Sequence, residues 1–197
     1  MGLGGANCEK IVYAGEREVF SLSVSERRDE PTLANVADRD IRGLCGRYLD
    51  FDYHARAKML VACTRGERVE FIAEKSDESG RYLGVVQDIP LPGATLCTFC
   101  GKSGDVVCAV STGVRLLRRG ANGTWALTEE LDLGAEVSAL CDSFAGLANG
   151  RVLRFFGDSD RLCAEEVGTL TGRVTSLDAW GSAVLAADEF GACLLAE

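Results

Sequence analysis

Apolar stretches along this chain alternate with short polar turns, and one arrangement recurs five times. An apolar run leads through a glycine-containing turn into a second apolar run, as in residues 107–112 followed by residues 114–117. The turn glycines are spaced by 51, 47, 37 and 41 residues. They are Gly15, Gly66, Gly113, Gly150 and Gly191. Two apolar runs around a glycine turn are typical of a β-hairpin, so we expect five hairpins at a regular period.

The second half of the chain shows the clearest strand pattern. Asn122-Gly123 and Asn149-Gly150 are strong hairpin-turn sequences, because the turn residues require positive φ. Residues 136–141, 150–156 and 173–180 are predicted strands. Residues 32–44 have apolar positions near helical spacing, and we expect the segment 25–46 to be a long connection with one helical turn.

Hairpins that recur every 40–50 residues are typical of a β-propeller, in which each blade is a small antiparallel sheet. We therefore predict an all-β fold, with residues 1–197 forming one propeller-type domain of about five blade-like repeats or a part of a larger propeller. An incomplete propeller would leave an open blade face and open strand edges. In that case we expect the chain to be bound to larger proteins.

Composition restricts the partners. The chain has 47% hydrophobic and 26% charged residues and a net charge of −9, which disfavours a general nucleic-acid surface. Arg115, Arg118 and Arg119 could form a local basic patch, but the outward face of a strand is the favoured interpretation. The nine cysteines are odd in number and mostly lie in apolar strands, so we expect a reducing, intracellular environment without a disulfide framework. No apolar run reaches the ~20 residues of a membrane span, and no membrane partner is expected.

Few residues suggest catalysis or metal binding. Cys97 and Cys100 have the C-x-x-C spacing of half a zinc knuckle, but the sequence has no second pair of ligands for a closed tetrahedral site. His54 is the only histidine and falls in a predicted polar turn, which leaves no basis for a nucleophilic triad. We expect no metal, no cofactor and no catalytic residue. Acidic pairs such as Glu129-Glu130 and Glu165-Glu166 are interpreted as solvated strand edges that discourage aggregation.

Large aromatic side chains are candidates for a partner interface. Some aromatics should pack between blades, while others should be exposed and anchor a partner. Phe155 and Phe156 are neighbours in a predicted strand, so their rings should point to opposite faces. The predicted interface residues are Trp125, Phe155, Trp180 and Phe190.

The chain from about residue 44 to its end resembles one propeller of the damaged-DNA-binding protein 1 family, which includes splicing factor 3b subunit 3 and the large subunit of the cleavage and polyadenylation factor. Local similarities occur in order at residues 68–75, 89–96 and 104–116, and the turn at residues 187–191 is most similar to that of the splicing member. The chain departs from the family in length, since members carry three propellers, and it lacks the family's aromatic residue within residues 169–173.

This resemblance implies a non-catalytic scaffold subunit of a large nuclear complex, in pre-mRNA splicing by preference. Other protein subunits would be its partners, among them a helical-repeat scaffold. An adaptor of a ubiquitin-ligase or polyadenylation complex is the alternative within the same class. A small propeller hydrolase or lyase is the alternative from another class, which the single His54 disfavours because propeller enzymes typically converge several such side chains on a central channel.

Overall fold

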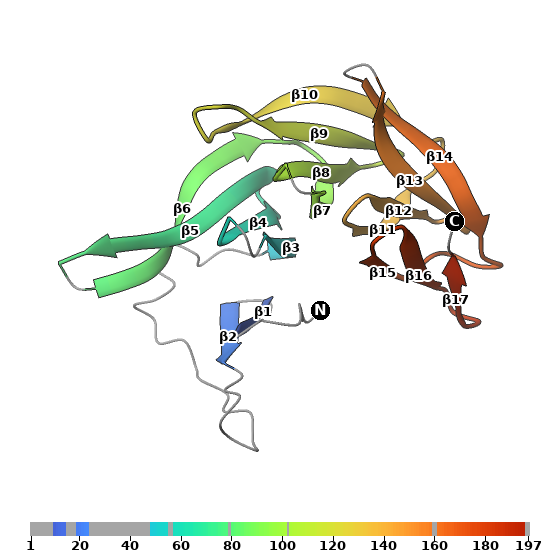
Figure 1. The fold of residues 1–197 in the computed structure, drawn as a ribbon, viewed down its shortest axis with the longest axis horizontal. Coiled ribbons are helices and arrows are strands. Elements are labelled where there is room, and N and C mark those ends of the chain that lie inside the picture. The colour runs from blue at the N-terminus through green and yellow to red at the C-terminus, as the bar shows by residue number, and fades with distance from the viewer. Residues whose placement is uncertain are drawn as a thin grey trace. The chain divides into compact units, whose positions relative to one another are not determined.

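A computed structural model describes residues 10–14, 19–23, 48–54, 57–78, 80–101, 103–158 and 161–195. The predicted connection at residues 25–46 and the turn at Gly15 lie outside these residues. Every regular element in the described part of the chain is a β-strand (Figure 1). The strands are β1 (Lys10–Ala14), β2 (Val19–Ser23), β3 (Tyr48–His54), β4 (Met59–Thr64), β5 (Arg68–Asp77), β6 (Gly80–Pro90), β7 (Ala94–Cys100), β8 (Asp105–Val110), β9 (Gly113–Arg119), β10 (Trp125–Asp132), β11 (Val137–Cys141), β12 (Phe144–Leu147), β13 (Arg151–Asp158), β14 (Arg161–Thr169), β15 (Ser176–Trp180), β16 (Ala183–Ala187) and β17 (Ala192–Leu195).

The chain divides into two compact units, Met1–Leu91 and Pro92–Glu197. The first unit contains the hairpin β1-β2 and the four-stranded antiparallel sheet β3-β4-β5-β6. On one face of that sheet, Leu60, Ala62 and Ile72 form a buried cluster with partly buried aromatic neighbours.

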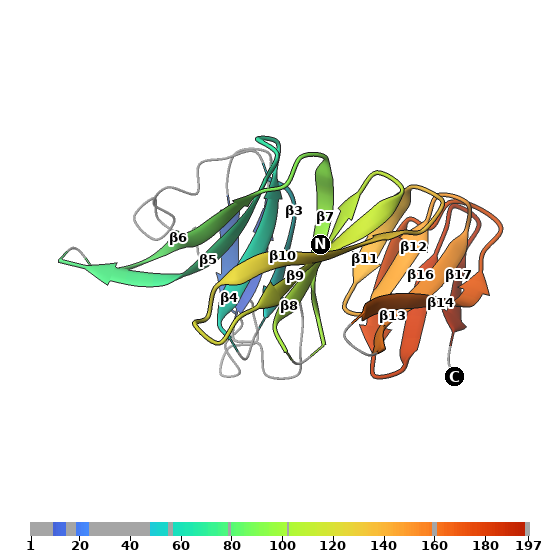
Figure 2. The ribbon, with the colours of Figure 1, turned by 90° about the horizontal axis from the view of Figure 1, so that it is seen from above.

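The second unit contains three antiparallel sheets in which each strand pairs with the next in sequence, with the orders β7-β8-β9-β10, β11-β12-β13-β14 and β15-β16-β17. Figure 2 shows them following one another along the unit. Leu153 and Phe155 of the middle sheet pack in a cluster with residues of the first. Phe144 and Val152, on the opposite face of the middle sheet, pack against the third. The alternation of side chains along each strand therefore gives the middle sheet two buried faces.

The repeated glycine turns are equivalent in the structure, as predicted. Gly66, Gly113, Gly150 and Gly191 all lie at the turn between the second and third strands of their sheets. A Cβ added at Gly113 would lie 2.5 Å from the carbonyl oxygen of Leu131. Gly150 has φ +90°, and a Cβ there would clash with a backbone carbonyl as well. At these two turns the backbone at the end of the fourth strand, or just after it, leaves no room for a side chain.

The fourth strands carry a repeated set of ion pairs. Arg115 and Arg118 on β9 pair with Glu130 and Glu129 on β10, at 2.9 and 2.8 Å. Arginine–glutamate pairs recur 36 residues later in each partner, between β13 and β14. Those pairs are Arg151–Glu166 and Arg154–Glu165. The acidic pairs thus lie on outer strands, as expected, but they are neutralised by arginines of the neighbouring strand.

Candidate functional site

The sheet β15-β16-β17 has one buried face and one exposed face. Val184 and Ala186 are almost fully buried and pack in the cluster shared with the middle sheet. Leu185 lies between them in sequence and therefore points to the opposite face. The register pairs Asp178 with Leu185 and Leu185 with Leu194, so these three side chains form one row across the exposed face. We call this surface the C-terminal face.

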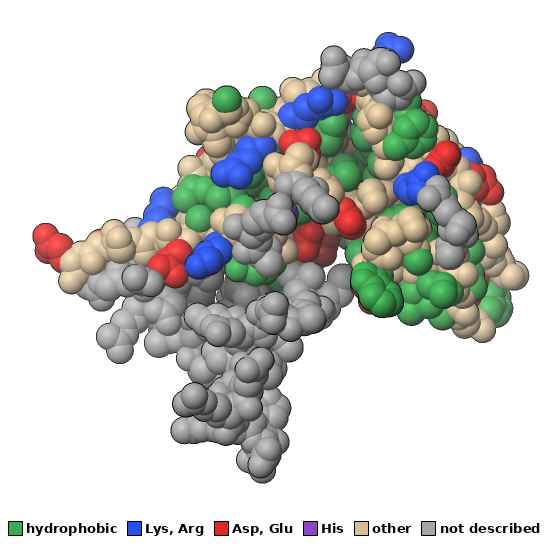
Figure 3. All heavy atoms as spheres, in the orientation of Figure 1, with side chains coloured by type: hydrophobic (Ala, Val, Ile, Leu, Met, Phe, Trp, Pro, Cys, Tyr) green, Lys and Arg blue, Asp and Glu red, His purple; other side chains and the backbone are tan. Residues whose placement is uncertain are grey.

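The C-terminal face is strongly apolar. Leu185 is 46% exposed and its cross-strand partner Leu194 is 67% exposed. Trp180 shares the alternation of Asp178 on β15 and is 91% exposed. Figure 3 shows hydrophobic side chains gathered over this sheet. Single exposed apolar residues are common on proteins, whereas a cluster of them on one sheet face is typical of a binding surface.

Phe190, at 71% exposure, lies in a well-defined turn between β16 and β17. The Asp188 carboxylate accepts hydrogen bonds from the backbone N–H groups of Gly172, Phe190 and Gly191, at 2.8, 2.8 and 3.0 Å. The N–H of Gly172, followed by those of the turn, lowers the pKa of Asp188 below its ordinary value. An aromatic side chain is thus presented to solvent on a turn that is held by several hydrogen bonds.

The other two predicted interface aromatics lie in the interior of the second unit. Trp125 is 4% exposed, its indole N–H donates to the carbonyl of Gly104 at 2.8 Å, and Arg119 stacks on its ring at 5.0 Å. Phe155 is also 4% exposed and packs between the first and middle sheets, while Phe156 points outward at 41% exposure. Trp125 and Phe155 are therefore core residues and not part of the C-terminal face. Each packs against a turn or sheet whose position could not be inferred from the sequence.

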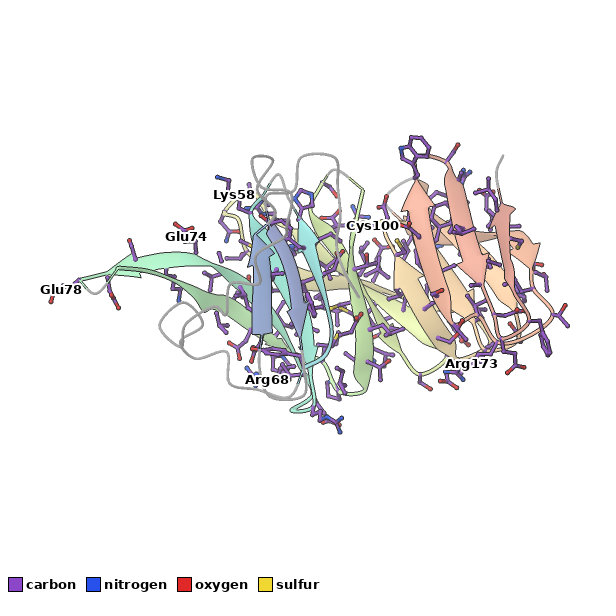
Figure 4. The ribbon with its side chains drawn as sticks, turned by 90° about the horizontal axis from the view of Figure 1, so that it is seen from below. Lys58, Arg68, Glu74, Glu78, Cys100 and Arg173 are labelled. Atoms are coloured by element: carbon purple, nitrogen blue, oxygen red, sulfur yellow. The ribbon has the colours of Figure 1, made fainter. Side chains whose placement is uncertain are left out.

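The residues that were considered for metal binding or catalysis, Cys97, Cys100 and His54, all lie in strands of the fold. Cys97 and Cys100 both lie in β7, and their separation of three places them on opposite faces of the strand. Cys100 is labelled in Figure 4. Burial, with the nearby Asp142 and Asp105, raises the pKa of Cys100 to about 12. His54 is at the end of β3, and its Nδ1 accepts a hydrogen bond from the N–H of Ala57 at 3.0 Å. Among the described residues no group of three or more His, Cys, Asp or Glu side chains is arranged to hold a metal ion.

Charge separates the C-terminal face from the neighbouring sheets. The last basic residue of the sequence is Arg173, which pairs with Glu136 at 2.7 Å in the connection before β15 (Figure 4). Asp178, Asp188 and Glu189 follow it, and none of them forms an ion pair among the described residues. This sheet therefore has a net negative charge beside its apolar surface.

Two residues of the face, Leu185 and Leu194, were missed in the sequence interpretation. Both lie in apolar runs that predicted buried strands, and neither run shows which face is covered. The two sets of arginine–glutamate pairs are 36 residues apart in the sequence, and β17 (Ala192–Leu195) contains no arginine. That difference could have shown from the sequence that the last sheet is unlike the two before it.

Comparison with known proteins gives the class of fold. No protein-family model matches the chain, and no curated protein matches it by sequence. A chain in the structure of the mitotic checkpoint complex matches with a TM-score of 0.67 at 10% identity, over 95% of this chain and 60% of that one. A putative 6-phosphogluconolactonase from Bacteroides uniformis matches with a TM-score of 0.62 at 11% identity, over 96% and 67%. The computationally designed Ika4 protein matches with a TM-score of 0.55 at 15% identity, over 79% and 94%.

These similarities and the meander sheets show that the chain has a β-propeller-type fold, as predicted. The chain spans between 60% and 67% of the length of the two natural proteins named above. The described residues contain no helix that is long and apolar enough to cross a membrane.

Proposed function

We propose that this protein is a non-catalytic protein-interaction module, and that a partner protein docks on the C-terminal face. This proposal rests mainly on a difference between two neighbouring sheets, each of which has one face directed toward the C-terminal end of the second unit. One face of the sheet β11–β14 is covered by Val174, Val184 and Ala186. Within the second unit, by contrast, no described sheet packs on the C-terminal face, which exposes Trp180, Leu185 and Leu194.

The residue types agree with protein binding. Tryptophan is among the side chains that most often dominate interface energetics, and apolar neighbours exclude water around it. Burying a side chain such as Leu194 stabilises a complex by about 1.5–3 kcal/mol before the entropic cost of association. Two leucines and an indole on one sheet face therefore supply the apolar contacts on which a partner can anchor.

We further propose that this binding takes place in a large intracellular assembly, and a nuclear splicing complex is the favoured one. The turn at residues 187–191, which resembles that of the splicing member of the damaged-DNA-binding protein 1 family, supports this finer assignment. Affinity purification of the tagged chain from nuclear and cytosolic extracts tests it. Enrichment of splicing-factor subunits from the nuclear extract is expected, and exclusive recovery of polyadenylation or ubiquitin-ligase subunits would favour the alternative scaffold.

The docking proposal is tested by quantitative affinity purification with matched variants. Leu185→Asp and Leu194→Asp put a charge on the C-terminal face, whereas Leu127→Asp puts one on β10, at a leucine of similar exposure, 43%. We expect the face variants to lose the proteins that wild type captures, and Leu127→Asp to retain them. Equal capture by all variants would show that this face does not dock a partner.

A further inference from the structure

The edge of the C-terminal sheet is the second unusual feature of this region. Each of the three four-stranded sheets places a fourth antiparallel strand, β6, β10 or β14, on its third strand. The C-terminal sheet ends at its third strand, β17, and no described strand pairs with the far side of β17. The three four-stranded sheets therefore show that an antiparallel strand fits on this edge.

The sequence of β17 is that of an interior strand. Each fourth strand contains a bulge and at least one charged residue, which are devices that protect an outer edge. β17, by contrast, has the sequence Ala-Cys-Leu-Leu, with no charge, no proline and no register shift. It is also fixed in place, since Leu195 packs where a Cβ of Gly168 would lie, at 2.7 Å.

Two residues of β17 direct their backbone N–H and C=O groups toward the open edge. The N–H of Asp188 donates to the carbonyl of Gly191 at 2.9 Å and so defines the first hydrogen-bonded pair of the β16–β17 hairpin. Bonded and non-bonded pairs alternate along an antiparallel ladder. Cys193 therefore bonds to β16, whereas the N–H and C=O groups of Ala192 and Leu194 point away from it.

We propose, building on the docking function above, that β17 accepts a fourth strand from a partner protein by antiparallel β-strand addition, and that this strand is apolar and basic. Main-chain hydrogen bonds to Ala192 and Leu194 supply affinity in this mode, and alternate side chains supply specificity. The partner's apolar side chains lie beside Leu194 on the C-terminal face. Lys or Arg at the C-terminal end of the added strand lies near Glu189 and Asp188.

The chemistry of this strand differs from that of the chain's own fourth strands. β10 and β14 present two glutamates each to arginines of the third strand. β17 has no arginine, and the adjoining turn contributes two carboxylates without a basic partner among the described residues. An acidic strand would place like charges together here, whereas a basic strand complements them.

A synthetic peptide and two variants of one residue test the proposal. The probe is a fluorescein-labelled peptide of nine residues, the length of β14, with alternating valine and threonine and two lysines at its C-terminal end. Its control has two glutamates in place of the lysines. Ala192→Pro removes an N–H that points to the edge, and Ala192→Val keeps that N–H while retaining a good strand former. Circular dichroism melts verify that both variants remain folded.

The lysine peptide is expected to bind the wild-type chain and Ala192→Val equally, measured by fluorescence anisotropy. Ala192→Pro and the glutamate peptide should each weaken binding about tenfold or more, equivalent to about 1.4 kcal/mol. Hydrogen exchange at the amides of Ala192 and Leu194 should slow in the complex, while that of Cys193 stays unchanged. Should Ala192→Pro itself unfold, the exchange result in wild type decides.

Undiminished binding to a folded Ala192→Pro, no binding of the lysine peptide to wild type, or unaltered exchange at Ala192 and Leu194 would overturn strand addition. If Leu185→Asp nevertheless abolishes partner capture, docking on the face stands and only the edge proposal fails. If neither Leu185→Asp nor Ala192→Pro affects capture, the docking function fails as well.

Discussion

Replacement of Gly146 by alanine tests how tightly the connection that leads into the C-terminal sheet packs on the middle sheet. A Cβ at Gly146 would lie 2.6 Å from the Cβ of Val174 and would also clash with one of its methyl groups. Val174 is fully buried, its N–H donates to Leu147 at 3.2 Å, and its carbonyl accepts from Ser138 Oγ at 2.6 Å. Val174 is thus fixed on both sides and cannot move aside freely.

We expect Gly146→Ala to destabilise the protein by about 2–3 kcal/mol, at the upper end for an overpacked core. The smaller entropy of an unfolded alanine chain offsets ~0.5 kcal/mol of that cost. For a chain of this size the remaining loss should lower the midpoint of thermal unfolding by about 3–10 °C. Gly157→Ala is the matched control, because nothing lies within 4 Å of a Cβ at Gly157, and its midpoint should stay near that of wild type.

A double-mutant cycle isolates the contact. Val174→Ala alone should cost about 2 kcal/mol through lost burial and a cavity. Combined with Gly146→Ala, the two changes should compensate, because the new methyl group occupies the space that the valine leaves. We expect a favourable coupling of about 1.5 kcal/mol or more, measured by urea unfolding followed with circular dichroism. Additive effects, or a Gly146→Ala midpoint equal to that of Gly157→Ala, would refute the packing described for these sheets.

Three further predictions concern titratable and metal-binding groups. Purified native protein should contain no stoichiometric zinc by elemental analysis, because Cys97 and Cys100 lie on opposite faces of β7; one zinc per chain would contradict this. Because the pKa of Cys100 is raised to about 12, its thiol should resist alkylation at pH 8, and rapid alkylation of the folded protein would contradict this environment. The stability that the protonated thiol contributes should be lost as the pH rises from about 9 toward 12. Because the pKa of Asp188 is lowered, the stability that its carboxylate contributes is present above the ordinary pKa near 3.8 and is lost as the pH falls below it. Asp188→Asn should therefore reduce the melting temperature at pH 7 and lessen the loss of stability in acid. An unchanged dependence of the melting temperature on acidic pH would contradict this role.

The sequence was sufficient to predict the repeated hairpins, because glycine turns have strict local requirements. Gly113 and Gly150 are needed where a strand end approaches the turn, whereas a Cβ at the equivalent Gly66 or Gly191 would meet no such clash. The opposite orientation of Phe155 and Phe156 followed from strand alternation alone. These features depend on residues close in sequence.

The candidate surface could be predicted only in part. Trp180 and Phe190 were selected as aromatic residues and are exposed, but Trp125 satisfied the same criterion and is buried under Arg119 with its indole N–H bonded to Gly104. Whether an aromatic side chain is exposed depends on which sheet lies over it, and that is a long-range property. Leu185 could be assigned to the surface only once the sheet order was known.

Site-specific photo-crosslinking in native cells tests the docking function most directly. A photoreactive amino acid is placed at Leu185 or Leu194 on the C-terminal face, and at Leu127 on β10 as the control of similar exposure to Leu185. We predict that the two face positions form crosslinks to the same partner protein, identified by mass spectrometry, and that the Leu127 position does not. Crosslinks to that partner from Leu127 alone, or none from either face position, would contradict a docking role for the C-terminal face.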